Sequence, residues 1–221
     1  MTEPETRYEY NLDKQLTQIV RPDGQTVVFN YQPTAGRLDS VSLPHGQLSY
    51  SYDVTTGNLS TVTAPDNSTL SYSYDGSLPL SETWDNGFIK GTLALTYDND
   101  FRVTASRINE ANTINYQYDT DSLLVQAGEL TLTHDAQHGL LTTTELGKLK
   151  TERTHNPFGE MATETATYDG HTRYSVQYVY DKLGRITQKT ETVEGTTSVL
   201  IYSYDDAGRL STVSQDGVIT E

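Results

Sequence analysis

The sequence predicts an all-β fold, an antiparallel meander of tandem β-hairpins. A four-residue string, Tyr-x-Tyr-Asp or a close variant, recurs along the 221 residues. Apolar and polar residues alternate before each copy, which is the period of a β-strand. The chain also has 16 tyrosines against 4 phenylalanines. Tyrosine suits the half-buried surface of a sheet, because its ring is apolar and its hydroxyl is polar.

Each copy of the string has a final aromatic residue, which we call the anchor. The anchors are Tyr10, Tyr31, Tyr52, Tyr74, Tyr97, Tyr118, His134, His155, Tyr180 and Tyr204. Their spacing is mostly about 21 residues, and a recurring period of this length indicates a repeat architecture. We therefore expect one array of about ten repeats over residues 1–221, with residues 1–7 and 214–221 as the ends of a fragment.

The strand before each anchor is expected to place its aromatic residues on one face of the sheet. Leu48, Tyr50 and Tyr52 lie two residues apart and alternate with Ser49 and Ser51. The same pattern recurs before the anchors at 74, 118, 180 and 204. We predict a structural ladder of tyrosines along this face, formed by Tyr50, Tyr52, Tyr72, Tyr74, Tyr116, Tyr118, Tyr178, Tyr180, Tyr202 and Tyr204.

Two turns are expected in each repeat. The first follows the anchor: an aspartate accepts bonds from backbone amides, and a glycine takes the positive φ that closes the turn. The residues assigned to these roles are Asp53, Asp181 and Asp205, and Gly36, Gly57, Gly184 and Gly208. The second turn has strings such as "RPDGQ" at Arg21 and "APDNS" at Ala64. The resulting sheet of about 20 strands cannot stay flat and must twist, coil or close.

The strand after each anchor turn, which we call the return strand, alternates less regularly. Leu59 and Val62 are three residues apart, as are Leu210 and Val213, so in a regular strand the two would face opposite ways. A β-bulge after the turn would bring both residues to one face.

Composition excludes several classes of function. The formal net charge of −15 disfavours binding to nucleic acid or to anionic membranes. Without cysteine, the chain has neither disulfides nor thiolate metal sites. No apolar run approaches the roughly 18 residues of a membrane span. No nucleophile elbow, phosphate loop or dinucleotide fingerprint is present, so we expect neither an enzyme nor a bound cofactor.

The remaining candidates for ligand sites have simpler structural explanations. His134 and His155 stand at anchor positions, where substitution for tyrosine explains them better than metal binding. The "DND" at Asp98 and "DTD" at Asp119 resemble fragments of calcium loops, but they lack the downstream glutamate, and turn formation is the expected role. Trp84 is the single tryptophan, and it either packs over the sheet or stacks on a sugar ring.

The longest repeat strings resemble the signature of the YD-repeat family, also called Rhs repeats. "YVYDKLGRI" at Tyr178 and "YSYDDAGRL" at Tyr202 are similar to it almost letter for letter, and related strings run from Tyr8 to about Val213. The resemblance implies a β-sheet that spirals into a hollow shell. In bacterial Tc and polymorphic toxins such a shell encloses an effector, and in teneurins it is a scaffold for cell adhesion.

The resemblance implies that this chain is a segment of the wall of a β-shell or spiral barrel, in a secreted or cell-surface protein. Its partners would be the remainder of the shell and an enclosed polypeptide. The alternative is an extracellular adhesion module that binds carbohydrate or protein, with Trp84 as a candidate contact. Unpaired edge strands invite pairing between sheets, so the isolated chain is also expected to self-associate.

Overall fold

Twenty-one β-strands and no helix make up residues 5–219, which the computed structural model describes. The chain divides into two units, one up to Ile114 and the other from Asn115. Within the described residues no helix is long and apolar enough to cross a membrane. The first four and last two residues of the predicted fragment ends lie outside the described part of the chain.

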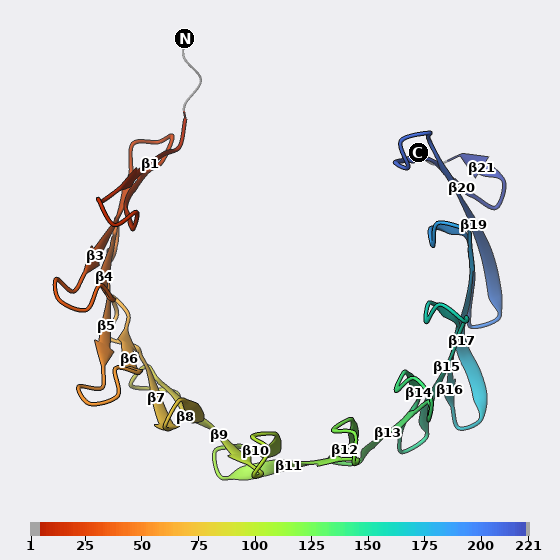
Figure 1. Ribbon diagram of the computed structural model, residues 1–221, viewed down its shortest axis with the longest axis horizontal. Helices are drawn as coiled ribbons and strands as arrows, with labels where there is room; N and C mark the ends of the chain where they lie inside the picture. The colour runs from red at the N-terminus through yellow and green to blue at the C-terminus, as the bar shows by residue number, and fades with distance from the viewer. Residues whose placement is uncertain (1–4, 220–221) are drawn as a thin grey trace. The chain divides into compact units, whose positions relative to one another are not determined.

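The first unit is an antiparallel meander in which each strand pairs with its neighbours in sequence. Figure 1 shows it as successive hairpins. Its strands are β1 (Arg7–Tyr10), β2 (Leu16–Val20), β3 (Thr26–Tyr31), β4 (Leu38–Leu43), β5 (Gly46–Tyr52), β6 (Leu59–Thr63), β7 (Thr69–Asp75), β8 (Leu78–Asp85), β9 (Lys90–Tyr97) and β10 (Val103–Ile108).

The second unit has the same antiparallel order, and β11 (Ala111–Tyr118) spans the boundary between the units. Its other strands are β12 (Leu124–Ala127), β13 (Leu130–His134), β14 (Leu141–Leu146), β15 (Leu149–His155), β16 (Met161–Tyr168), β17 (His171–Tyr180), β18 (Ile186–Val193), β19 (Thr196–Tyr204), β20 (Leu210–Gln215) and β21 (Val218–Ile219). The predicted all-β meander is confirmed.

A β-bulge lies at every anchor. Tyr52 pairs with Leu59, but Ser51 pairs with Thr61, so one residue of the return strand is skipped. The same shift occurs at the other nine anchors. Val62 therefore lies opposite Tyr50, on the face that carries Tyr52 and Leu59. The bulge that the sequence predicted from the spacing of Leu59 and Val62 is confirmed.

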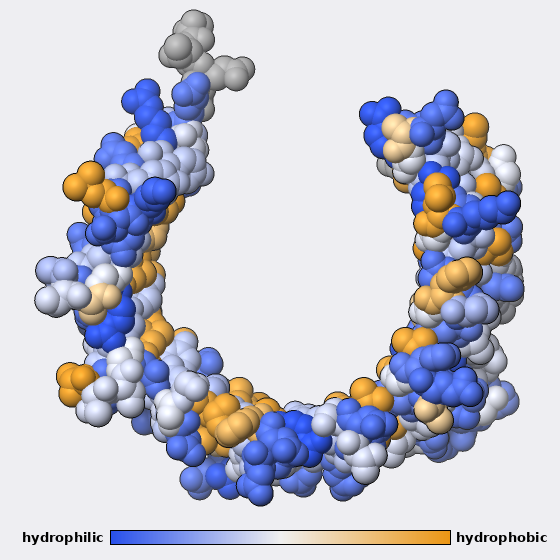
Figure 2. Space-filling view, in the orientation of Figure 1, coloured by the Kyte–Doolittle hydropathy of each residue, from blue (hydrophilic) through white to orange (hydrophobic). Residues whose placement is uncertain are grey.

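The core is thin, because each unit is a single layer of sheet. Among the described residues the deeply buried apolar side chains are Val41 (6% exposed) and Val176 (3%). Leu48, Tyr50 and Tyr52 on β5 are half-buried, while Ser49 and Ser51 between them are exposed. In Figure 2 apolar residues of the first unit gather along one side of its strands. Each sheet thus has one apolar face that no second layer of described residues covers.

Candidate functional site

The turn after each anchor, called the anchor turn from here on, is closed by one aspartate. Asp181 Oδ1 accepts hydrogen bonds from the N–H groups of Leu183 (2.8 Å) and Arg185 (3.1 Å). Asp181 Oδ2 accepts from Arg185 Nε at 2.7 Å. The backbone N–H of Arg185, followed by its side chain, holds the pKa of Asp181 below the usual value of 3.8. Gly184 completes the turn with φ +75°, in the left-handed region that glycine adopts readily.

Other anchor turns vary this arrangement. Asp205 accepts from the N–H groups of Ala207 (3.0 Å) and Arg209 (2.9 Å) and from Arg209 Nε (2.8 Å). Asp53 has no arginine partner in its turn and instead accepts from the N–H and the hydroxyl of Thr56. The backbone N–H of Thr56 is the main cause of the lowered pKa of Asp53. The aspartate therefore acts as an acceptor in the turn whether or not a cation is present.

The hydroxyl of the anchor tyrosine ties its own repeat to the preceding one. Tyr204 donates to the carbonyl of Ile186 at 2.7 Å, and Ile186 is the first residue of the preceding return strand. Equivalent bonds join Tyr31 to Leu16, Tyr52 to Leu38, Tyr97 to Pro79 and Tyr180 to Met161, with O···O distances of 2.7 to 2.9 Å. These ties cross the sheet between hairpins and add to the ladder of backbone bonds.

The residue just before the partner of the anchor in the return strand, which we call the cap position, lies next to the following anchor turn. At this position the guanidinium carbons of Arg37 and Arg185 lie 4.5 and 4.4 Å from the ring centroids of Tyr52 and Tyr204. Burial raises the pKa of Tyr52, while the charge of Arg37 opposes that shift. Each of these arginines therefore stacks on an anchor of the next repeat, within the range of a cation–π contact.

The other tyrosine of each predicted pair lies two residues before the anchor, on the same half-buried face. Ring centroids are 6.4 Å apart both for Tyr72 and Tyr74 and for Tyr178 and Tyr180. Burial, followed by the charge of Glu82, raises the pKa of Tyr72. The structure thus places the predicted tyrosines along the strands, but their weight in stability stays a prediction.

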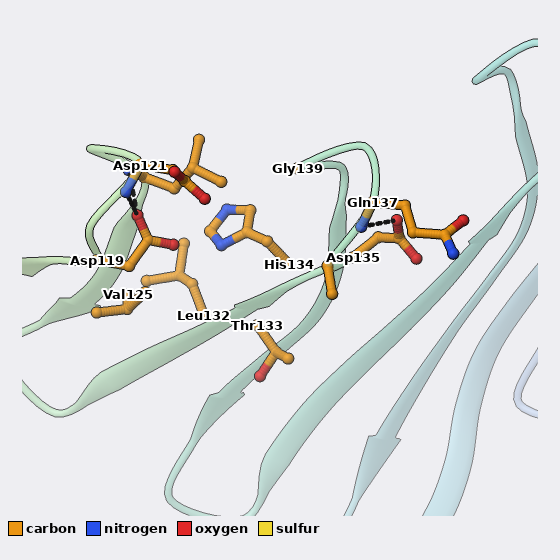
Figure 3. Close-up of a pocket in the computed structure, with 11 residues that line it drawn as sticks. Asp119, Asp121, Val125, Leu132, Thr133, His134, Asp135, Gln137 and Gly139 are labelled. Atoms are coloured by element: carbon orange, nitrogen blue, oxygen red, sulfur yellow. Dashed lines mark hydrogen bonds between the residues drawn. The ribbon is translucent and has the colours of Figure 1, made fainter.

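The histidine anchors lie where tyrosine stands in other repeats. His134 ends β13 and pairs with Leu141 at the same bulge. Figure 3 shows its ring beside Asp119 and Asp121 of the preceding anchor turn, at a cavity of about 580 Å³. His134 Nδ1 is buried with no hydrogen-bond partner among the described residues. Within residues 5–219 no three His, Cys, Asp or Glu side chains are grouped to hold a metal ion.

The acidic strings at Asp98 and Asp119 are also anchor turns. Asp98 accepts from the N–H groups of Asp100 and Arg102 and pairs with the side chain of Arg102 at 2.8 Å. Asp119 accepts from the N–H groups of Asp121 and Leu123. Both carboxylates therefore hold turns in the way that Asp181 does.

Trp84 lies on β8 and pairs with Gly91 of β9. A Cβ atom added at Gly91 would overlap the indole ring, so the ring rests on the glycine backbone. The side chain is 37% exposed. An aromatic residue that covers a cross-strand glycine is a known way of stabilising a sheet. This position agrees with the packing alternative, while sugar binding by Trp84 stays a prediction.

Two features of these turns were not predicted from the sequence: the acceptors of the anchor hydroxyls and the role of the cap position. Both depend on how far one hairpin is offset along the next, and the sequence of a single repeat does not determine that offset. The arginine that follows glycine at 37, 185 and 209 was a signal for the second feature.

The comparisons agree with this geometry. Residues 2–221 match the model of the Teneurin YD-shell family. Teneurin-3 of Danio rerio is 26% identical over an alignment 219 residues long, which covers 93% of this chain and 8% of that protein. Crystal structures of TcdB2-TccC3 and TcdB2-TccC3-TEV superpose with TM-scores of 0.74 and 0.71, at 17% and 14% identity.

The two superpositions cover 94% and 96% of this chain, but only 13% and 15% of the toxin chains. At such low identity they show a shared fold alone. The chain therefore spans a small part of the length of every relative named here, and the activities of the whole proteins do not transfer with the fold.

Proposed function

Because this chain belongs to the Teneurin YD-shell family, we propose that it is a wall segment of a larger hollow β-shell. In this proposal the chain has a structural role and catalyses no reaction. The shell belongs to a secreted or cell-surface protein, and it encloses a polypeptide such as a toxin or effector. The partners of the segment are then the flanking repeats of the shell and the enclosed polypeptide.

The observation that carries the proposal is the tie between successive repeats. Five anchor hydroxyls bond to a carbonyl of the first or second residue of the preceding return strand. Each tie fixes one hairpin against the next without a second layer of structure. A sheet held in this way is suited to serve as a thin wall, because its stability comes from contacts within the layer.

The apolar face of each sheet supports the same proposal. Its tyrosine and leucine side chains are half-buried, and no described segment packs over them. Apolar surface that a chain leaves uncovered commonly contacts another polypeptide. We propose that this face, or the flanking part of the shell, contacts the enclosed chain.

Limited proteolysis with intact-mass analysis of the full-length parent protein tests the proposal. We expect a polypeptide outside the repeats to stay intact while exposed loops of the same protein are cut. The double variant Tyr180→Phe, Tyr204→Phe, which loses two ties, should speed its digestion. The control Tyr168→Phe should not, because the Tyr168 hydroxyl bonds to none of the described residues and the ring is 50% exposed.

Digestion at the rate of an unstructured peptide in the wild type would overturn the enclosure. The repeats would then be better explained as an adhesion surface for carbohydrate or protein. A glycan array with the wild type and Trp84→Ala separates that alternative, since binding lost in the variant would favour it.

A further inference from the structure

The cap position in front of Tyr180 holds an acid. Among the described repeats the residues at this position are Gln15, Arg37, Asn58, Leu78, Arg102, Leu123, Leu140, Glu160, Arg185 and Arg209. Glu160 is the single carboxylate of this series. The repeat it belongs to, "HNPFGEM" from His155, otherwise forms an ordinary anchor turn in which Asn156 Oδ1 accepts from the N–H groups of Phe158 and Glu160.

Three cap side chains of the first unit donate to the next anchor turn. Gln15 Nε2 donates to the carbonyl of Gly36 at 2.8 Å, and Arg37 Nη1 donates to the carbonyl of Gly57 at 2.8 Å. Asn58 does the same to Gly76 at 2.6 Å. Where the cap is Arg37 or Arg185, the guanidinium also stacks on the next anchor ring.

Glu160 cannot perform either task, because an ionised carboxylate has no proton to donate and no positive charge to place over a ring. Its Oε2 accepts from Asn156 Nδ2 at 2.6 Å. Its Oε1 lies against Gly184, only 2.6 Å from the position of a Cβ built on that glycine. The ring of Tyr180 therefore has a carboxylate beside it where Tyr52 and Tyr204 have a guanidinium.

A cavity of about 530 Å³ lies beside this carboxylate. Tyr180, Glu160 and Gly184 line it, and Phe158 and Leu183 stand at its rim, 88% and 76% exposed. The carboxylate of Asp181, which also lines it, is already paired with Arg185. Lys182 is the one cation in the lining, and it forms no ion pair within residues 5–219.

We propose that this cavity binds an arginine side chain of a partner polypeptide. The incoming guanidinium enters the cavity beside the Glu160 carboxylate, which itself stands where Arg37 and Arg185 place their guanidinium groups. It stacks on the ring of Tyr180, and it donates to the Glu160 carboxylate and to the carbonyl of Gly184. Apolar residues beside the arginine contact Phe158 and Leu183. The net charge of −15 favours the approach of a basic segment.

The test is a titration of the whole chain with the peptide acetyl-Leu-Arg-Leu-amide, followed by amide NMR. The matched control peptide carries citrulline, which has nearly the same shape as arginine but no charge. We expect saturable shifts at Gly159, Glu160 and Gly184 with the arginine peptide, and affinity at least about fivefold weaker with citrulline. The amide of Gly208 should not shift, because Arg185 already fills the equivalent place beside it.

Variants separate this site from a general attraction to an acidic protein. Glu160→Arg should abolish the shifts and raise the melting temperature, because the new guanidinium fills the cavity from within. Glu160→Gln should weaken binding at least about fivefold, and Lys182→Gln should strengthen it. Asp206→Asn, which removes a negative charge outside the cavity, is the matched control and should leave the affinity unchanged.

Equal binding of both peptides, or unchanged binding in Glu160→Arg, would overturn the proposal. So would shifts at the same amides that grow with protein concentration in the absence of peptide, since a second copy would then be the occupant. The wall proposal does not depend on this result, because the cavity lies at one anchor turn and the hydroxyl ties recur along the chain.

Discussion

Gly184 is constrained both by its backbone conformation and by the side chain that lies against it. Its φ of +75° lies in the left-handed region, where a side chain adds strain. A Cβ there would also meet Glu160 Oε1. Gly170 has a similar φ of +77°, but nothing lies within 4 Å of its Cβ position. A side chain added at Gly170 therefore meets backbone strain alone, while one added at Gly184 also meets Glu160.

We expect Gly184→Val to lower the free energy of unfolding by about 1–3 kcal/mol, because a β-branched residue strains a left-handed backbone. Gly170→Val should cost less, since it adds strain without the contact. Thermal or urea unfolding of both variants measures the difference. An unchanged melting temperature for Gly184→Val would contradict the role of this glycine in the turn.

The aspartates of the anchor turns make stability depend on acid. Backbone N–H donors hold the folded pKa values of Asp181 and Asp205 below 3.8. A lowered folded pKa gives a contribution that is complete well above 3.8 and is lost as the pH falls through the folded value. Melting temperatures between pH 6 and pH 2.5 should therefore drop mainly below about pH 4.

Asp181→Asn should make that drop shallower. Asp206→Asn is its control, because the Asp206 side chain has no hydrogen-bond or ion-pair partner within residues 5–219. The same pH profile for Asp181→Asn and the wild type would show that the turn carboxylate does not contribute to the loss of stability at low pH.

At the scale of the elements, the tie between hairpins is the feature to test. Tyr204→Phe keeps the ring under Arg185 and removes only the bond to the carbonyl of Ile186. We expect a loss of about 0.5–1.5 kcal/mol in unfolding free energy, the usual value for a neutral hydrogen bond. Tyr168→Phe, at an exposed ring, should change it little. Equal effects of the two variants would mean that the tie carries no particular weight.

The β8–β9 pair offers a second test at this scale. Gly91→Val alone should destabilise the protein by about 1–3 kcal/mol, because the new side chain displaces the Trp84 ring. In a Trp84→Ala background the same change should be neutral or stabilising, since valine favours strands over glycine. Urea unfolding of the four proteins gives the coupling. Additive effects would contradict the packing of Trp84 on Gly91.

Much of the element order was predictable, because the residues of each repeat determine its own strand and turn. The spacing of Tyr50 and Tyr52 predicted the strand before the anchor, and that of Leu59 and Val62 predicted the bulge after it. The contact of Trp84 with Gly91 was not predictable, since it requires the register between two strands. Left-handed Lys14 and Phe101, at glycine positions of their turns, were missed because neither residue type favours positive φ.

The candidate site was predictable only in part, for the same physical reason. The aspartate and the glycine of an anchor turn act within that turn, so the local sequence is enough to predict their roles. The hydroxyl of Tyr204 acts on a carbonyl 18 residues away, and that distance is spanned only after two hairpins pair. The cavity at Glu160 likewise forms only where one anchor turn lies beside the next, so the sequence of one repeat does not predict it.

In the whole molecule, each repeat depends on its neighbours for stability. Within each unit the strands pair with their neighbours in sequence, and the apolar face of each sheet has no second layer among the described residues. Stability of such an array comes from each repeat and its interface with the next one. Weakening several ties at once should therefore loosen a wall more than any single substitution does.

We propose that this chain forms part of a closed wall around another polypeptide, and electron cryo-microscopy of the full-length parent protein tests this arrangement. We expect the strands of residues 5–219 to continue into flanking repeats of the same sheet and to border a cavity that contains density for a further polypeptide. Repeats that stand open to solvent on both faces, with no enclosed density, would contradict it.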